Sequence, residues 1–270
     1  MGLQTLDRAL TLLRALGSSG EEGMRLIDLE KSAKLTKPTT HRLLSALVAH
    51  GLVARDAKSR RYRLGRELAI LGWSVAHRQQ DLRTLSMQSA SLLAEETGDT
   101  VFVVARSGLD TVCIERRSGA YPIKTLTLDV GSRRPLGVGA GSLAILASLP
   151  PEECDATLEA VAGRLAGQTL ASNSQLRATI SEARRTGFAV SNGYVAEVVR
   201  GIAVAIRDFR GEPIAAIGIA AILPRIPSDR IPKLVQMLER ERRRLESRLL
   251  TAGSHGSSSG PSRSRRHRLR

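Results

Sequence analysis

The sequence predicts an α+β protein of two domains, in which a small helical module with a basic hairpin precedes a larger domain of strands and helices. Length, composition and charge lead to this prediction. The chain has 270 residues, 42% of them apolar, which is enough for two modest domains with cores of their own. Residues 1–80 carry 14 basic and 7 acidic side chains, whereas residues 81–250 carry 22 and 19. The positive excess of the first segment predicts a polyanionic partner for it.

Three helices are predicted in the first part of this small module, residues 3–51. Leucines recur at helical spacing over residues 3–16 and predict a helix with one buried stripe, formed by Leu3, Leu6, Leu10, Leu13 and Leu16. A shorter helix is expected over residues 28–33, followed by a tight turn. A third helix begins after Thr36, a good amino-terminal cap, and ends at Gly51.

A basic hairpin follows the third helix. Residues 52–54 and 61–64 predict two short strands joined by a polar tip. Three helices followed by a basic hairpin are the elements of a winged helix-turn-helix. We therefore expect a DNA-binding domain over residues 1–65 and a linker helix over residues 66–80.

The third helix and the hairpin carry the chemistry for contact with double-stranded DNA. Lys and Arg can reach guanine O6 and N7 in the major groove, and Thr can offer a hydroxyl or pack on a thymine methyl. Basic hairpin residues can meet phosphate or enter the minor groove. A single charge is more often a solvated surface residue, but the ordered combination indicates DNA binding. The expected contacts are Thr36, Lys37, Thr39, Thr40, His41 and Arg42 of the helix, and Lys58, Arg60, Arg61 and Arg63 of the hairpin.

Helices and strands are mixed in the larger domain, residues 81–250. Strands are expected at residues 100–105, 111–116, 123–127, 188–191, 201–206 and 214–221. Helices are expected over residues 82–97, from the Gly-rich stretch at 136–142 to 149, from 150 onward, over 175–186 and over 229–250. The segment 251–270 is rich in Ser, Gly and Arg and predicts a disordered basic tail.

Enzyme chemistry finds little support in the larger domain. Residues 81–250 contain no histidine, which excludes a Ser/His or Cys/His nucleophilic pair within them. The Gly-rich stretch has neither the phosphate-loop nor the dinucleotide spacing. Its exposed N–H groups could hold a carboxylate at a helix amino terminus, or the stretch could be a turn that only packs.

No cofactor, metal ion or membrane partner is expected. The two cysteines, Cys113 and Cys154, make neither a disulfide framework nor a four-thiolate zinc site. No stretch approaches the roughly 18 apolar residues of a membrane helix, and the amino terminus lacks the order of a signal peptide. We expect a cytoplasmic protein.

These motifs in this order resemble the IclR family of bacterial transcription regulators, over residues 3–250. Residues 5–10 (TLDRAL), 34–44 (KLTKPTTHRLL) and 61–65 (RYRLG) resemble the family's first helix, recognition helix and wing exit. Residues 95–100 (EETGDT), 130–136 (VGSRRPL) and 200–206 (RGIAVAI) fit its effector domain. One departure is Ile27, which stands where a capping Ser or Thr is common.

The resemblance implies a GAF-like effector-binding domain, a curved antiparallel sheet flanked by helices, with a small organic acid in the concave face. It also implies a homodimer or homotetramer, more often a repressor than an activator. Carried over residue by residue, the effector-binding positions are Ile123, Ala140, Gly141, Ser191, Val199, Gly201, Gly218 and Ala220.

The departures at these positions bear on the effector. Where some relatives place Asp, Cys and two Ser, this chain has Ser191, Gly201, Gly218 and Ala220, so a metal-ligating Cys is missing. Small apolar residues favour an aromatic or medium-chain carboxylate, its carboxylate against the helix that follows Gly139. Two alternatives stay open: a DNA-binding protein with a vestigial ligand domain, and a metabolic enzyme.

Overall fold

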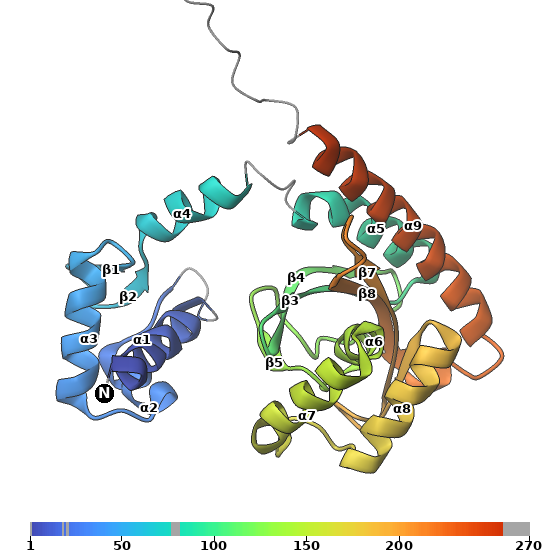
Figure 1. Ribbon diagram of the computed structural model, residues 1–270, viewed down its shortest axis with the longest axis horizontal. Coiled ribbons are helices and arrows are strands. Elements are labelled where there is room, and N and C mark those ends of the chain that lie inside the picture. The colour runs from blue at the N-terminus through green and yellow to red at the C-terminus, as the bar shows by residue number, and fades with distance from the viewer. Residues whose placement is uncertain (1, 18, 20–21, 77–81, 256–270) are drawn as a thin grey trace, which may run out of the picture.

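The computed structural model describes residues 2–17, 19, 22–76 and 82–255, which form a small helical part and a larger α+β part (Figure 1). The small part contains helices α1 (Gly2–Gly17), α2 (Leu26–Ala33) and α3 (Lys37–Ala49), then strands β1 (Val53–Arg55) and β2 (Tyr62–Leu64), and helix α4 (Arg66–Ala76). The predicted helix-turn-helix with its hairpin is confirmed. Residues 77–80 of the expected linker helix lie outside the described residues.

Two details of the small part differ from the prediction. The core face of α1 runs through Leu12 and Leu16, whereas Leu6 and Leu10 are 56% and 37% exposed, so the predicted stripe is not buried as a whole. The inward residues of α1 meet α2, α3 and the hairpin in a cluster of Leu12, Leu16, Leu29, Leu43, Leu44, Leu47, Val53 and Tyr62. Arg25 caps α2, so Ile27 lies inside this helix rather than at its cap.

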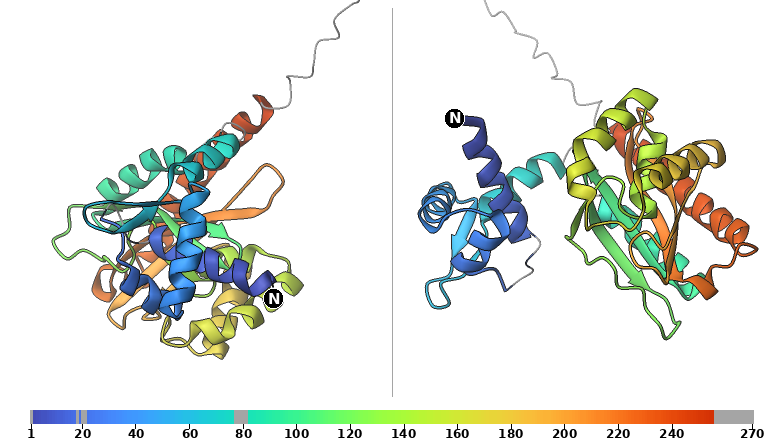
Figure 2. Two further views of the ribbon diagram at one scale, coloured as in Figure 1. Left: turned by 90° about the vertical axis from the view of Figure 1, so that its left-hand side faces the viewer. Right: turned by 90° about the horizontal axis from the view of Figure 1, so that it is seen from below.

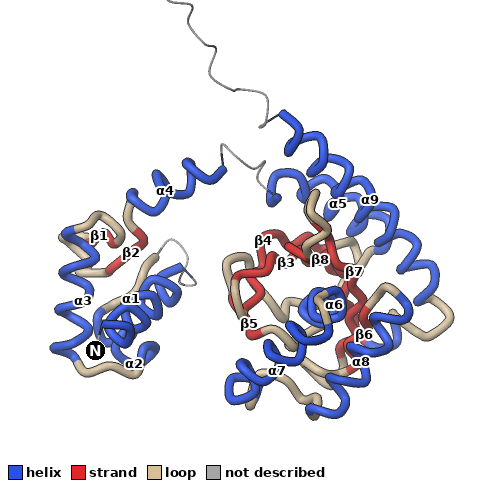
Figure 3. Tube along the Cα trace, in the orientation of Figure 1, coloured by secondary structure: helices blue, strands red, loops and turns tan. Residues whose placement is uncertain are grey.

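The larger part is built on a six-stranded antiparallel sheet (Figure 3). Its strands are β3 (Thr100–Ser107), β4 (Asp110–Ser118), β5 (Arg133–Pro135), β6 (Ala189–Asn192), β7 (Val199–Arg207) and β8 (Pro213–Ile222). They lie in the order β5-β4-β3-β8-β7-β6. The predicted strand at residues 123–127 was wrong, because residues 133–135 take the ladder beside β4 instead.

Helices cover both faces of this curved sheet (Figures 1 and 2). Helix α6 (Ala140–Ser148) lies in the concave face, with α7 (Pro151–Leu165) and α8 (Asn173–Thr186) beyond it. Helices α5 (Leu82–Thr97) and α9 (Ile231–His255) pack on the convex face, and the short 3₁₀ helix η1 (Leu223–Arg225) precedes α9. Helix α9 continues past Leu250, where the tail was expected to begin; residues 256–270 lie outside the described residues.

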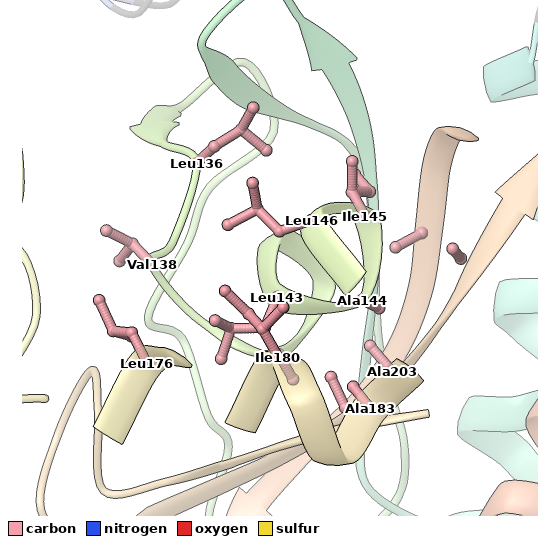
Figure 4. Close-up of a cluster of buried hydrophobic side chains, with 14 of the residues drawn as sticks. Leu136, Val138, Leu143, Ala144, Ile145, Leu146, Leu176, Ile180, Ala183 and Ala203 are labelled. Atoms are coloured by element: carbon pink, nitrogen blue, oxygen red, sulfur yellow. The ribbon is translucent and has the colours of Figure 1, made fainter. Parts of the chain in front are cut away.

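The two faces of the central strands carry side chains of different size. In β7, Ile202, Val204 and Ile206 belong to the convex core with α5 and α9. Their neighbours Ala203 and Ala205 belong to the concave core, together with Ala216 of β8. Because side chains alternate along a strand, this sequence places large residues on one face and small ones on the other. The small face gives α6 room to lie against the sheet, where its leucines complete the cluster in Figure 4.

A buried carboxylate ties the end of α5 to the segment before α9. Asp99 is 4% exposed, and its oxygens Oδ1 and Oδ2 lie 2.9 Å from Arg225 Nε and 2.8 Å from Arg230 Nη1. Both arginines also donate to the carbonyl oxygen of Thr97, the last residue of α5. Arginines at a helix carboxyl terminus are favoured by its dipole, so this cluster stabilises the convex side.

We expect Asp99→Ala to lower the free energy of unfolding by about 3–5 kcal/mol, because two half-buried arginines would lose their counter-ion. Urea denaturation measures this loss. The matched control is Glu182→Ala, which removes an exposed ion pair with Arg185 and should change stability by less than about 1 kcal/mol. Equal effects of the two substitutions would contradict a structural role for Asp99.

Candidate functional site

The first candidate site is the exposed face of helix α3. Thr36 is its amino-terminal cap residue, with extended backbone, and Pro38 lies in the first turn as predicted. The Thr36 hydroxyl donates to Thr39 Oγ1 at 3.0 Å rather than accepting from the helix backbone. Lys37, His41 and Ser45 then follow at intervals of four residues on the solvent side, so they form one exposed row.

Thr40 does not belong to this row. It is 0% exposed, and its hydroxyl donates to the carbonyl oxygen of Thr36 at 3.0 Å. Thr40 shares the buried side of α3 with Leu43, Leu44 and Leu47. The prediction that Thr40 contacts DNA is therefore wrong, because helical periodicity turns it toward the core. Ser45, which sequence reasoning missed, takes the place of Thr40 as a candidate contact.

The exposed cations of α3 are not neutralised by acidic side chains of the described residues. Lys37 and Arg42 form no salt bridge with any acidic side chain of the described residues. Helix α3 has no acidic residue in its first turn. An exposed helix face with free positive charge and short polar side chains is suited to the major groove.

The hairpin presents further basic side chains from a well-ordered tip. Asp56 Oδ1 accepts from the backbone N–H groups of Ser59 at 2.7 Å and Lys58 at 3.1 Å. The hydrogen bond from the Ser59 backbone is the largest cause of the lowered pKa of Asp56. Arg60, beside this turn, is exposed and has a positive φ of 55°. The tip therefore holds Lys58 and Arg60 toward solvent.

The remaining hairpin arginines differ in their surroundings. Arg61 is half-buried and its Nη1 donates to the carbonyl oxygen of Gly23 at 2.9 Å, so it ties the hairpin to the segment before α2. Arg63 is exposed. Arg55, which sequence reasoning missed, is also exposed and lies with its guanidinium 5.6 Å from the Tyr62 ring centroid. Only the pairing of the two strands shows that Arg55 faces the same tip.

The second candidate site is a cavity of about 80 Å³ between the concave face of the sheet and the start of α6. All but one of the predicted effector-binding residues line it: Ala140, Gly141, Ser191, Val199, Gly201, Gly218 and Ala220. Ile123 does not line it and is 55% exposed. Residues 123–127 form no strand, so the side-chain alternation that would have turned Ile123 toward the sheet is absent.

Two glycines of the cavity wall are required by close packing. A Cβ atom on Gly141 would lie 2.8 Å from Val104 Cγ2, and one on Gly218 would lie 2.7 Å from the carbonyl oxygen of Ile202. Both distances are too short for real contacts. Gly141 thus lets α6 approach β3, and Gly218 lets β8 lie close to its neighbour β7. Larger residues at either position would disturb the fold rather than only fill the cavity.

Polar groups reach the cavity from several elements. Gly139 caps α6 with a φ of 84°, and the N–H groups of the helix amino terminus face this region. The Ser142 hydroxyl is already engaged within the protein, because it accepts a hydrogen bond from the Gly137 N–H at 2.5 Å. Ser191 is 4% exposed, and no hydrogen bond within the described part of the chain uses its hydroxyl.

Sequence reasoning missed four polar residues of the lining, namely Thr111, Thr127, Arg134 and Ser142. Arg134 donates from Nη2 to the carbonyl oxygen of Thr127. Three of the four come from β4, β5 and the loop before β5, elements that only the curl of the sheet brings to the cavity. The signal that could have found Arg134 is its place next to the Gly-rich stretch in the segment 130–136.

Comparison with known proteins is decisive for the family. The protein-family model for the bacterial transcriptional regulator IclR C-terminal domain matches residues 75–246. The family model for the IclR helix-turn-helix domain matches residues 5–57. The chain belongs to the IclR family. It is thus a DNA-binding transcription regulator with an effector-binding domain, and the metabolic-enzyme alternative is excluded.

Individual relatives agree over nearly the whole chain. The chain is 26% identical to the HTH-type transcriptional regulator XynR of Escherichia coli, covering 88% of this chain and 93% of that protein. It is 29% identical to the glycerol operon regulatory protein of Streptomyces coelicolor, covering 93% and 98%. A solved IclR transcriptional regulator from Silicibacter has a TM-score of 0.74 at 26% identity, covering 95% and 98%.

One similar solved structure is a complex with a small-molecule ligand. It is an IclR homologue from Microbacterium hydrocarbonoxydans complexed with 4-hydroxybenzoate, with a TM-score of 0.66 at 23% identity, covering 92% of this chain and 99% of that one. In our chain, the described residues contain no group of His, Cys, Asp and Glu side chains that could hold a metal ion. None of its described helices is long and apolar enough to cross a membrane.

We expect Arg60→Gly to weaken DNA binding without weakening the fold, because glycine accepts the positive φ that arginine adopts at the hairpin tip. If Arg60 meets phosphate, the slope of log affinity against log salt should fall by about one unit with sequence preference unchanged. Fluorescence anisotropy over a salt series measures this. Arg185→Ala, which removes a cation from α8 of the other domain, should leave the slope unchanged. A wild-type slope for Arg60→Gly would contradict phosphate contact.

Proposed function

We propose that this chain is a ligand-responsive regulator that represses its target by binding an operator, and whose operator affinity changes when an aromatic or medium-chain carboxylate enters the cavity. The observation that carries the proposal is the cavity itself. It is lined by apolar walls, a helix amino terminus and the hydroxyl of Ser191, which has no hydrogen-bond partner among the described residues. A domain that had lost its ligand would be expected to close this space with larger side chains.

Operator recognition is assigned to α3 and the hairpin. Lys37, His41, Arg42 and Ser45 face solvent on α3 and would read base edges, while Thr36 and Thr39 approach the phosphate at the start of the helix. Lys58, Arg60 and Arg63 would hold phosphate beside the groove, with Arg55 next to them. Arg61 would contribute mainly by fixing the hairpin, since it already bonds Gly23.

A dimer is the smallest unit that suits such a module, because one recognition helix reads only a few base pairs. Exposed apolar side chains on the small part support this assembly: Leu6 and Leu10 on α1, and Ile70 and Leu71 on α4, are between 37% and 56% exposed. We propose that α1 and α4 contribute to a homodimer interface, on which a homotetramer could be built.

Replacing Leu6 and Leu10 together by Asp should weaken the dimer at least about tenfold, because two exposed leucines would be exchanged for charges in an apolar contact. Light scattering over a concentration series measures the change. Leu170→Asp, at an exposed leucine of the other domain, is the matched control and should behave as wild type. A wild-type protein that is monomeric at micromolar concentration would contradict the proposal.

The volume of the cavity sets a limit on the effector. About 80 Å³ is smaller than the roughly 150 Å³ of an apolar cavity that holds benzene. An aromatic body would therefore require the wall to move outward, and the segment between β6 and β7 is placed to do so, with Val195 and Val199 in the wall and Val198 exposed. The Microbacterium relative with 4-hydroxybenzoate supports the idea that this fold accepts such an acid.

We expect 4-hydroxybenzoate, benzoate or octanoate to raise the melting temperature of the protein and to change its affinity for an operator selected from a random duplex pool. Ala220→Leu should abolish both effects, because its side chain would occupy the cavity, whereas Ala220→Ser leaves the space and should retain them. Operator binding without ligand should survive in both variants.

The alternative of a vestigial ligand domain makes the opposite prediction. In that case no acid of the panel changes the melting temperature or the operator affinity, and Ala220→Leu is indistinguishable from wild type. Stabilisation only by acids as small as glyoxylate would also contradict the proposed effector class.

A further inference from the structure

Two neighbouring arginines of strand β5 differ in their partners and in the direction of their side chains. Arg133 Nη1 lies 3.4 Å from Asp110 Oδ2, and its Nη2 donates to Ser107 Oγ at 2.9 Å, so this arginine is paired within the domain. Arg134 is the next residue, and because side chains alternate along a strand it points the other way. It lines the cavity described above.

Arg134 has no counter-ion within the part of the chain that the structure describes. Of the acidic side chains that the structure describes, none lies within ion-pair distance of its guanidinium, whereas 13 other arginines from Arg83 to Arg244 are paired. Its Nη2 donates to the neutral carbonyl of Thr127. A guanidinium has five N–H donors, so most of them stay available for a ligand.

The surroundings of Arg134 do not remove or balance its charge. Burial lowers the pKa of Arg134, but an arginine stays protonated in proteins at neutral pH. The nearby Cys113 thiol cannot neutralise it, because burial raises the pKa of Cys113 to about 11 and the sulfur is uncharged at pH 7. The Arg134 guanidinium thus places one positive charge at the cavity wall that no described acidic side chain balances. A bound anion would stabilise this charge.

A second polar group faces the cavity from the opposite edge of the sheet. Arg134 belongs to β5 and Ser191 to β6, the two outermost strands of the order β5-β4-β3-β8-β7-β6. The curl of the sheet brings both to one cavity, with apolar residues such as Phe102, Val104 and Val138 in the wall. Ser191 is nearly fully buried and has no partner within the described residues, so a ligand group is the natural partner for its hydroxyl.

We propose that Arg134 is the specificity-determining anchor for the effector's carboxylate, and that the Ser191 hydroxyl together with the amino terminus of α6 receives a hydrogen-bonding group at the far end of the same molecule. The inference rests on the proposed function and deepens it. It changes the place expected for the carboxylate, since a full guanidinium charge outweighs the roughly half charge of a helix amino terminus. The effector class is an acid with an apolar body and a distal polar group.

The test uses pairs of ligands that differ only in charge: 4-hydroxybenzoate, benzoate and octanoate, each beside its primary amide. Isothermal titration calorimetry on the wild-type protein should show a preference for the acid of about 10- to 100-fold. Arg134→Gln should lose this preference while binding the amide within about threefold of wild type. Arg134→Lys, which keeps the charge, should restore part of the preference and guards against a mere loss of folding.

Ser191→Ala tests the second contact. It should reduce the affinity for 4-hydroxybenzoate at least about threefold and leave that for benzoate, which has no distal polar group, unchanged. An equal loss for both acids would overturn the role of Ser191 at the far end of the ligand.

The outcomes separate this inference from the proposed function. If the wild-type protein binds acids in a way that Ala220→Leu blocks, but Arg134→Gln keeps the preference for acids over amides, the role of Arg134 is wrong and the proposed function stands. A wild-type protein that binds acid and amide equally would also overturn the inference alone. A wild-type protein that binds none of the six ligands would overturn both.

Discussion

The close approach of helix α6 to the concave face of the sheet is the constraint on which the effector domain depends. It is possible only because β7 and β8 present Ala and Gly on that face, while Ile and Val fill the convex side against α5 and α9. Gly141 marks the tightest point of this approach, where a Cβ atom would collide with Val104. Gly218 serves the pairing of β8 with β7, since a Cβ atom there would collide with the Ile202 carbonyl. The same small side chains that admit the helix leave the cavity at its amino terminus, so packing and ligand binding have one structural origin.

Charge divides the two parts of the protein in a similar way. On α3, Thr40 and the leucines are buried in the core. The cations on the solvent side have no acidic partners among the described residues. In the effector domain most described arginines are paired, and the one in the cavity wall is an exception. Both the solvent side of α3 and the cavity wall therefore carry positive charge that a ligand could balance, DNA at the first and, by our proposal, an acid at the second.

The order of helices and strands could be predicted from the sequence because hydrophobic periodicity and glycine or proline signals are local. Errors arose where the outcome depends on distant partners. Residues 133–135, rather than the predicted strand at 123–127, pair with β4. Ile123 is therefore exposed and does not line the cavity. The leucine stripe of α1 could not reveal that Leu6 and Leu10 stay exposed when only the described residues pack together. The roles of Arg134 and Ser191 depend on the curl that joins the two edges of the sheet, which no local pattern encodes.

Amide hydrogen exchange with and without 4-hydroxybenzoate tests the central claim most directly, because it reports where a ligand acts without requiring a known operator. The account predicts slower exchange in peptides that cover residues 133–142, at β5 and the start of α6, and residues 189–203, at β6 and β7. Exchange in α3 and the hairpin should not slow by direct contact at saturating acid when DNA is absent. Protection confined to other segments of the effector domain, with residues 133–142 unchanged, would contradict the account.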